Sequence, residues 1–282
     1  MDKIFVPPIK IQGIKTKLVP LIKENAILKE TTVWIEPFMG SGVVGFNIRP
    51  NRAMFSDINP HLINFYNALK FKQISNETVR EFLSEEGNNL SCKGEQHYYE
   101  IRERFNEFHN PLDFLFLNRA CFNGMIRFNR KGKFNVPYCH KPRRFSKAYI
   151  TKIVNQIKYV EQCFENYDWS FICQDFRKTI LQINKEKDIF IYCDPPYIGR
   201  HTDYYDSWDE VSEKNLCYAL KQLSKPFIIS TWVQNKFRIN NYVKDIWGFC
   251  NGLTQEHFYH VGAKEMNRHQ ITEAILMNFS LK

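Results

Sequence analysis

The sequence lacks the cysteine patterns that hold disulfide-rich and zinc-binding proteins together. Its 282 residues include eight cysteines, but none forms a CxxC pair and none joins a histidine at zinc-ligand spacing. The cysteines stand among apolar neighbours, as in "IYCD" and "FICQ". We therefore expect reduced cysteines in the core of a cytoplasmic protein, with no disulfide and no structural or catalytic metal.

Long apolar runs and targeting segments are also missing. No apolar run approaches the roughly 18 residues of a membrane span, and the first residues, "MDKIFVPPIKIQG", show no signal-peptide pattern. The chain has no internal repeat and no low-complexity tract. We expect no membrane partner.

Acidic residues are outnumbered, with 30 Asp and Glu against 39 Lys and Arg, a net charge of +9 and a pI near 9.0. This balance favours a polyanionic partner, nucleic acid first, over a merely basic soluble protein. Hydrophobic residues make up 44% and aromatic residues 15% of the chain, which excludes global disorder. The length suits one large domain, or one domain carrying a sizeable insertion.

Short apolar runs alternate with helical patterns along most of the chain. The runs, which read as buried strands, are 31–38, 52–57, 170–175, 188–194 and 226–232, and a late strand is expected in the tail "HQITEAILMNFSLK". Helical patterns occupy 15–27, 60–70 and 213–224. This alternation predicts an α/β fold with a mostly parallel sheet, whose ligands bind at the carboxyl ends of the strands.

The pattern of apolar and charged residues along the sequence changes between about residues 70 and 150. Two segments, 76–89 and 95–108, read as helices with charged faces. The stretch "RFNRKGKFNV" (127–136) then resembles a β-hairpin with an Arg-Lys-Gly turn. We interpret this region as an insertion between the second and third core strands.

Three short segments carry candidate chemistry. In "EPFMGSGVVGFNI" (36–48), small residues between a strand and a helix would let a ligand approach the backbone, although a simple tight turn explains them equally well. Asp57 ends the next strand, where an acid commonly accepts hydrogen bonds from ribose hydroxyls or caps a helix. "YCDPPY" (192–197) ends a buried run in an acid, two prolines and an aromatic ring, and alone it indicates no more than a turn.

Together, and in this order, these segments resemble the Dam-type, D12-class DNA adenine-N6 methyltransferases. "PPIKIQGIKTKLVPLI" is similar to the family's N-terminal motif, "EPFMGSG" to its methionine-pocket loop, "NRACFNGMIRFNRKGKFNVPY" to its target-recognition hairpin and "YCDPPY" to its catalytic motif. The resemblance implies a Rossmann-like methyltransferase sheet dependent on S-adenosylmethionine. Its catalytic domain would comprise residues 1–70 and 151–282, and its inserted recognition domain residues 71–150.

The resemblance also implies roles at the catalytic motif. Asp194 and the Pro195 carbonyl would accept the two N–H hydrogens of the target adenine amine and aim its lone pair at the methyl donor. Pro196 would stiffen the turn, because proline offers no competing N–H. Tyr197 would stack on the base once it leaves the duplex.

The same resemblance implies which residues bind the cofactor, each at its matching position in a family motif. These residues are Ile11, Lys15, Phe38, Gly40, Ser41, Asp57, Asp175, Phe176 and Asp194. Ile11 stands where many family members carry Trp, and Ile14 where they carry a second Gly, so this segment departs from the family pattern.

The resemblance also implies which residues would contact double-stranded DNA. Arg127 would read a guanine, since an arginine fork suits the major-groove acceptors of that base, and Lys10 would help to read the outer base pair. Phe122, Asn123 and Met125 would wedge in beside the flipped base. The phosphate-facing set would be Arg130, Lys131, Lys133, Lys141, Arg143 and Arg144.

The sequence leaves the substrate, the recognition site and the oligomeric state open. Alternative functions are methylation of cytosine N4, RNA adenine or a protein glutamine, or DNA binding by a relative without catalytic activity. The expected recognition site is GATC or another GA-containing sequence, and whether the enzyme is solitary or belongs to a restriction–modification system with a partner endonuclease is open. We expect a monomer from a bacterial, archaeal or phage-type source, associated with the nucleoid.

Overall fold

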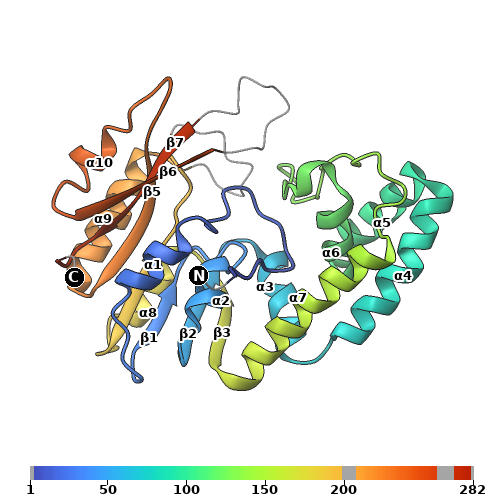
Figure 1. Ribbon diagram of the computed structural model, residues 1–282, viewed down its shortest axis with the longest axis horizontal. Coiled ribbons are helices and arrows are strands. Elements are labelled where there is room, and N and C mark those ends of the chain that lie inside the picture. Colours follow the sequence, from blue (N-terminus) through green and yellow to red (C-terminus); the bar gives the residue numbers. More distant parts are fainter. Residues whose placement is uncertain (1–2, 199–207, 259–269, 281–282) are drawn as a thin grey trace.

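A seven-stranded mixed sheet forms the centre of the protein (Figure 1). The computed structural model describes residues 3–198, 208–258 and 270–280. The strand order is β3-β2-β1-β4-β5-β7-β6, with β1 to β5 parallel and β7 antiparallel between β5 and β6. The strands are β1 (Val33–Glu36), β2 (Arg52–Asp57), β3 (Asp168–Cys173), β4 (Ile189–Cys193), β5 (Phe227–Asn235), β6 (Asn251–Phe258) and β7 (Gln270–Met277).

This sheet confirms the predicted α/β class and the six expected strands. The strand that the sequence did not predict is β6, which pairs with β7 alone at the edge of the sheet. Its sequence, "NGLTQEHF", is mostly polar. An edge strand needs little apolar surface, so such a segment gives no buried-strand pattern.

Alternate residues of the strands face two apolar layers, as the period of two in a strand requires. Trp34 and Phe190 belong to one layer, whereas their neighbours Ile35 and Ile191 belong to the other. The first layer is covered by α1 (Val19–Asn25), α2 (Val43–Ile48) and α3 (Pro60–Lys70), and the second by α8 (Phe176–Ile183), α9 (Glu210–Leu223) and α10 (Tyr242–Asp245). The sheet is therefore covered by helices on both faces, so a ligand can reach it only at the strand ends.

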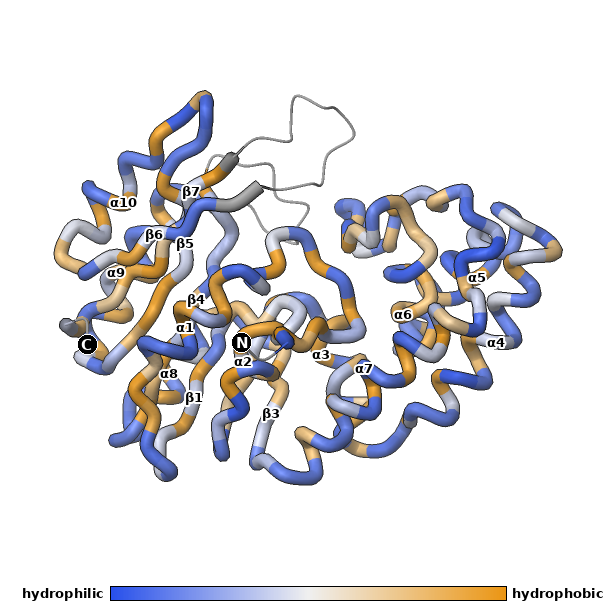
Figure 2. The backbone as a smooth tube through the Cα atoms, in the orientation of Figure 1, coloured by the Kyte–Doolittle hydropathy of each residue, from blue (hydrophilic) through white to orange (hydrophobic). Residues whose placement is uncertain are grey.

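Four further helices lie beside the sheet, on the side of α3 and β3 (Figure 1). They are α4 (Asn76–Lys93), α5 (Glu95–Phe108), α6 (Pro111–Ala120) and α7 (Lys147–Asn166). Figure 2 shows apolar and hydrophilic residues alternating along α4 and α7. The sequence predicted α4 and α5 but not α6, which is buried from Asp113 to Ala120 and so has no polar face to give a helical period.

The segment that we propose as an insertion begins where α3 ends, at Lys70. Its proposed end at residue 150 falls inside α7, which packs against both α4 and α3 before it leads into β3. A long helix thus connects the helical segment rigidly to the sheet.

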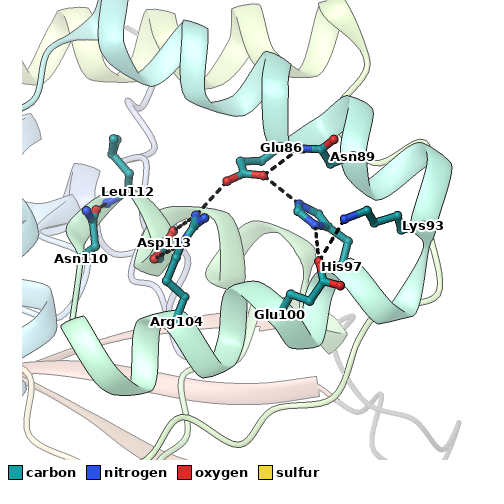
Figure 3. Close-up of polar contacts among 9 residues, drawn as sticks. All are labelled: Glu86, Asn89, Lys93, His97, Glu100, Arg104, Asn110, Leu112 and Asp113. Carbon is teal, nitrogen blue, oxygen red and sulfur yellow. Dashed lines mark hydrogen bonds and ion pairs between the residues drawn. The ribbon is translucent and has the colours of Figure 1, made fainter.

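A network of charged side chains ties α4, α5 and α6 together (Figure 3). Arg104 on α5 binds the buried carboxylate of Asp113 on α6 at 2.5 and 2.9 Å, and Glu86 on α4 at 2.8 Å. Burial acts to raise the pKa of Glu86, but the hydrogen bonds from Arg104 and Asn89 and the charges of Arg104 and His97 together leave that pKa below its usual value. One arginine therefore holds three helices in a fixed arrangement.

The structure corrects part of the prediction that the cysteines are reduced and lie in the core. All eight are free. Cys121, Cys163, Cys193 and Cys217 are buried, but Cys92 and Cys173 are exposed, so the prediction of core positions was wrong for those two. Cys92 lies near the polar end of α4 and Cys173 ends β3, where the pattern of apolar neighbours stops. Within the described ranges, no helix has the length and hydropathy of a membrane span.

Candidate active site

The candidate site lies at the carboxyl ends of β1 and β4. The chain passes from β1 to β2 on one side of the sheet and reaches β4 on the other, so the strand order reverses between β1 and β4. Ligands of open α/β sheets bind in the crevice at this reversal. The glycine turn follows β1, and Asp194 directly follows β4.

The glycine turn is shaped by backbone conformations that favour glycine. Gly40 has φ +51° and Gly42 has φ +74°. A Cβ atom on Gly42 would lie 2.7 Å from the Phe46 ring, whereas a Cβ on Gly40 would meet nothing nearer than Ile11 Cδ1 at 3.9 Å. Ser41, between them, is buried, and its carbonyl accepts a hydrogen bond from Tyr66 Oη at 2.7 Å. The turn is packed tightly behind Gly42 and is open beside Gly40.

Asp57 ties this turn to the end of β2. Its carboxylate accepts the Gly40 N–H at 2.9 Å and the Asn59 N–H at 2.9 Å. Burial raises the pKa of Asp57, although these N–H groups favour the charged form. The cap of α3 is Asn59, whose side chain accepts from the first turn, so the alternative reading of Asp57 as that cap was wrong.

Asp194 is held at both carboxylate oxygens. Lys15 Nζ lies 2.9 Å from Oδ2, and the Ser230 hydroxyl donates to Oδ1 at 2.7 Å. Lys15 is only 5% exposed and also donates to the Gly13 carbonyl. Burial raises the pKa of Asp194, while Lys15 and Ser230 act to lower it. The ion pair favours a charged carboxylate at the edge of the core.

Pro195 and Pro196 connect Asp194 to Tyr197, the second side chain of this motif that is held by a hydrogen bond. Tyr197 Oη donates to Glu273 Oε1 on β7 at 2.7 Å, and Lys15 Nζ lies 4.8 Å from the centre of the Tyr197 ring. Glu273 is 1% exposed. Lys15 therefore contacts both the acid and the aromatic ring of this motif.

An aromatic cluster borders the glycine turn on the other side. The Phe38 and Phe176 rings stack at 5.3 Å, and Trp208 packs against both. Asp175 precedes Phe176 and caps α8, accepting the N–H of Arg177 at 2.8 Å and the side chain of that arginine. Trp208 is a component that the sequence reasoning missed.

The N-terminal segment docks onto the helical segment near the site. Asn118 Nδ2 donates to the Lys10 carbonyl at 2.9 Å and to the Gly124 carbonyl at 3.2 Å, and Asn118 Oδ1 accepts the Lys10 N–H at 2.8 Å. Burial lowers the pKa of Lys10, whose side chain passes over Gly124. Asn118 thus brings Lys10 beside the turn that begins the predicted reading segment.

The predicted wedge residues lie in and after η1 (Phe122–Gly124). Phe122 is 40% exposed, although it is a large apolar side chain. Asn123 is exposed with φ +54°, a conformation that Asn tolerates, and Met125 is half-buried. An exposed aromatic ring next to a left-handed residue leaves this segment free to contact a partner.

The hairpin itself is short. A bridge pairs Phe128 with Phe134, and Gly132 has φ +70° at the turn. Arg127 donates to Asn135 Oδ1 at 2.7 Å and to the Asn135 carbonyl at 3.0 Å. Cations at its tip and beyond are exposed: Arg130, Lys131, Lys133, Lys141 and Arg143. Arg144 is half-buried, because it binds the Arg119 carbonyl and Tyr149 Oη.

Several side chains at the site were absent from the sequence prediction. Ser230 and Glu273 bond directly to Asp194 and Tyr197, and Tyr192, which lies in "YCDPPY" but was given no role, bonds to Ser230. Ser230 follows an apolar run in "PFIISTW", whereas Glu273 in "QITEAILM" has polar neighbours and gives no such signal. No group of three or more metal-ligating side chains gathers anywhere in the described parts of the chain.

The helix-covered sheet and the site at its strand reversal define the Rossmann-like fold class of S-adenosylmethionine-dependent methyltransferases. The sequence model of one family within it, "D12 class N6 adenine-specific DNA methyltransferase", matches residues 12–266. The chain belongs to this family.

Curated relatives are similar over much of the chain. The "DNA adenine methylase" of Vibrio cholerae is 35% identical over 195 residues, covering 67% of this chain and 64% of that protein. The "DNA adenine methylase" of Serratia marcescens is 31% identical over 239 residues, covering 79% and 82%. "Type II methyltransferase M.MjaIII" of Methanocaldococcus jannaschii is 32% identical over 211 residues, covering 68% of each. The chain thus spans less than two thirds of the Vibrio protein's length.

Proposed function

We propose that the protein is a site-specific DNA adenine-N6 methyltransferase that uses S-adenosylmethionine. The observation that carries this proposal is Asp194, held by Lys15 and Ser230 at the open end of β4 and followed by two prolines and Tyr197. Membership of an adenine-specific family and the net charge of +9 both support it.

The residues around the glycine turn fit this cofactor. The open space beside Gly40 suits a group that approaches the backbone, and the Asp57 carboxylate keeps acceptor capacity for ribose hydroxyls. The Phe38 and Phe176 rings offer an aromatic wall, with Asp175 beside it. When bound, the cofactor supplies a methyl group on a sulfonium, an electrophile that needs no metal.

At the catalytic motif, the protein's task is to orient a weak nucleophile. The adenine amine is weak because its lone pair is delocalised into the ring. Asp194 and the Pro195 carbonyl accept its two N–H hydrogens, and the carboxylate meets the positive charge that develops on nitrogen. Lys15 keeps Asp194 ionised despite its burial. Tyr197, oriented by its bond to Glu273, stacks on the base.

Residues 71–150 form the target-recognition domain in this proposal. Arg127, already fixed by Asn135, reads a guanine, and Phe122 fills the space left by the extruded adenine. The exposed cations at and after the hairpin contact phosphates. We propose GATC or another GA-containing sequence as the target. The similarity to a type II methyltransferase supports a place in a restriction–modification system.

The test uses labelled S-adenosylmethionine and duplex DNA with and without GATC, followed by nucleoside analysis. We expect N6-methyladenine in DNA from the wild-type protein and none from Asp194→Ala. The control Asp188→Asn, at the opposite end of β4 and bonded to Thr31, should retain activity. N4-methylcytosine, label in RNA alone, or retained transfer by Asp194→Ala would contradict the proposal.

A further inference from the structure

Three oxygen atoms on two neighbouring strands form a chain that leads out of the core to the site. Tyr192 Oη lies 3.0 Å from Ser230 Oγ, and Ser230 Oγ lies 2.7 Å from Asp194 Oδ1. Tyr192 and Ser230 are 1% and 0% exposed, whereas Asp194 is 22% exposed. The chain of hydrogen bonds therefore begins in the buried interior and ends at the partly exposed carboxylate of Asp194.

The direction of these hydrogen bonds follows from the chemistry of the three groups. An ionised carboxylate can only accept, so the single hydroxyl proton of Ser230 is donated to Asp194. The Ser230 oxygen is then left as an acceptor, and Tyr192 donates to it. Tyr192 is itself held by its ring, which stacks on Trp34 at 5.9 Å. Every proton in the chain thus points toward the carboxylate.

The sheet register fixes this arrangement. Cys193 on β4 pairs with Ile229 on β5, so Asp194 and Ser230 are the next residues along two parallel strands. A buried hydroxyl without a partner would cost stability, and Ser230 is fully buried after three apolar residues of β5. Its neighbour Thr231 directs its hydroxyl elsewhere, toward the Trp232 carbonyl at 3.5 Å. Ser230 is placed where its one proton reaches Asp194.

We propose that Ser230 is a positioning residue for Asp194, oriented in turn by Tyr192, and that this pair fixes the plane and the charge of the carboxylate for the methyl-transfer reaction. Lys15 fixes the second oxygen, so the carboxylate is held at two points and cannot rotate. This inference rests on the proposed function, because it assigns the support of the proposed acceptor.

Other charged groups around Asp194 also affect its pKa and must be considered in a test that varies pH. Lys15 favours its ionised form, and Glu273 on β7 opposes it. Glu36 at the end of β1, whose pKa burial raises to about 8, carries no charge at neutral pH. None of these changes when Ser230 is replaced by alanine. Loss of the hydroxyl removes one hydrogen bond to the charged form, and the pKa of Asp194 should rise by roughly one unit.

The experiment compares Ser230→Ala, Tyr192→Phe and the control Thr231→Val, which removes a buried hydroxyl from the same strand. First, the carboxyl carbon of Asp194 is titrated by NMR in the free protein and assigned by its loss in Asp194→Asn. Second, kcat and KM for duplex DNA are measured as a function of pH. We expect Ser230→Ala to raise the titration midpoint and the acid limb of kcat by about one unit. We also expect it to lower kcat by about 10- to 100-fold, with KM nearly unchanged.

Tyr192→Phe should shift both quantities in the same direction by less, and Thr231→Val should shift neither. An unchanged midpoint in Ser230→Ala, an unchanged kcat, or an equal loss of kcat in Thr231→Val would overturn the inference. Failure of the proposed function has a different outcome: the wild-type protein would transfer no methyl group to adenine, while the midpoint would still move in Ser230→Ala.

Discussion

The carboxyl group of Glu36 gives a quantitative test of the electrostatics behind the site. Glu36 ends β1, is 1% exposed and accepts a hydrogen bond from Trp34 Nε1 at 2.9 Å. Burial raises the pKa of Glu36 to about 8, with the nearby carboxylates of Asp194 and Asp57 contributing. The folded protein therefore keeps Glu36 protonated at neutral pH, whereas the unfolded chain ionises it near 4.5.

The sign and the size of the effect follow from this difference. Between pH 4.5 and about 8 the folded state holds one more proton than the unfolded state, so the free energy of unfolding falls as pH rises through this range and levels off above it. The gap of about 3.5 units, at about 1.36 kcal/mol per unit, gives a loss of roughly 5 kcal/mol. Glu36→Gln cannot ionise, so its stability should not include this loss.

Urea denaturation of both proteins at pH 5, 7 and 9 measures the effect. Other titrating groups are common to both proteins, and the difference in unfolding free energy isolates Glu36. The difference should move in favour of Glu36→Gln by several kcal/mol from pH 5 to pH 9. Glu24→Gln, which removes the same charge from an exposed position, should show no such trend. A pH-independent difference for Glu36→Gln would refute a protonated Glu36.

Three further predictions concern the supporting structure. Arg104→Leu leaves a buried carboxylate without its partner and should cost about 2–4 kcal/mol in urea denaturation, whereas Lys93→Ala breaks an exposed pair and should cost less than about 1 kcal/mol. Gly42→Ala should lower the melting temperature more than Gly94→Ala: both residues have positive φ, but an added Cβ meets a ring only at Gly42. Phe38→Ala should weaken S-adenosylmethionine binding about 10-fold in calorimetry, because it removes one aromatic wall.

The parts of the site that sequence reasoning found are those with local signals. The strand ends, the glycine turn and the Asp-Pro-Pro-Tyr motif each occupy a few consecutive residues, and parallel strands bring their carboxyl ends to one edge. Asp57 and Gly40 were both expected at the cofactor site, and a hydrogen bond of 2.9 Å joins them. The alternation of strands and helices likewise predicted most of the sheet.

The parts that it missed depend on contacts across strands. Ser230 and Glu273 lie 36 and 76 residues from their partners in the catalytic motif. A serine or a glutamate within an apolar strand indicates only that a polar group is buried. Which group satisfies it depends on strand order and register, and no local pattern predicts that the late strand β7 runs antiparallel between β5 and β6.

Lys15 shows that a contact between residues distant in sequence can also determine the chemistry of the site. Its motif position indicated a role in cofactor binding, but the structure places its ammonium group 2.9 Å from Asp194 and 4.8 Å from the Tyr197 ring. A buried carboxylate without such a partner would take up a proton and could no longer accept an amine hydrogen through that oxygen. The motif acid thus depends on a lysine 179 residues earlier in the chain (194 minus 15) for its charge. The reactivity of the Asp-Pro-Pro-Tyr turn is therefore a property of the assembled strand ends, and a substitution at Lys15 should change the chemistry of Asp194 as well as cofactor binding.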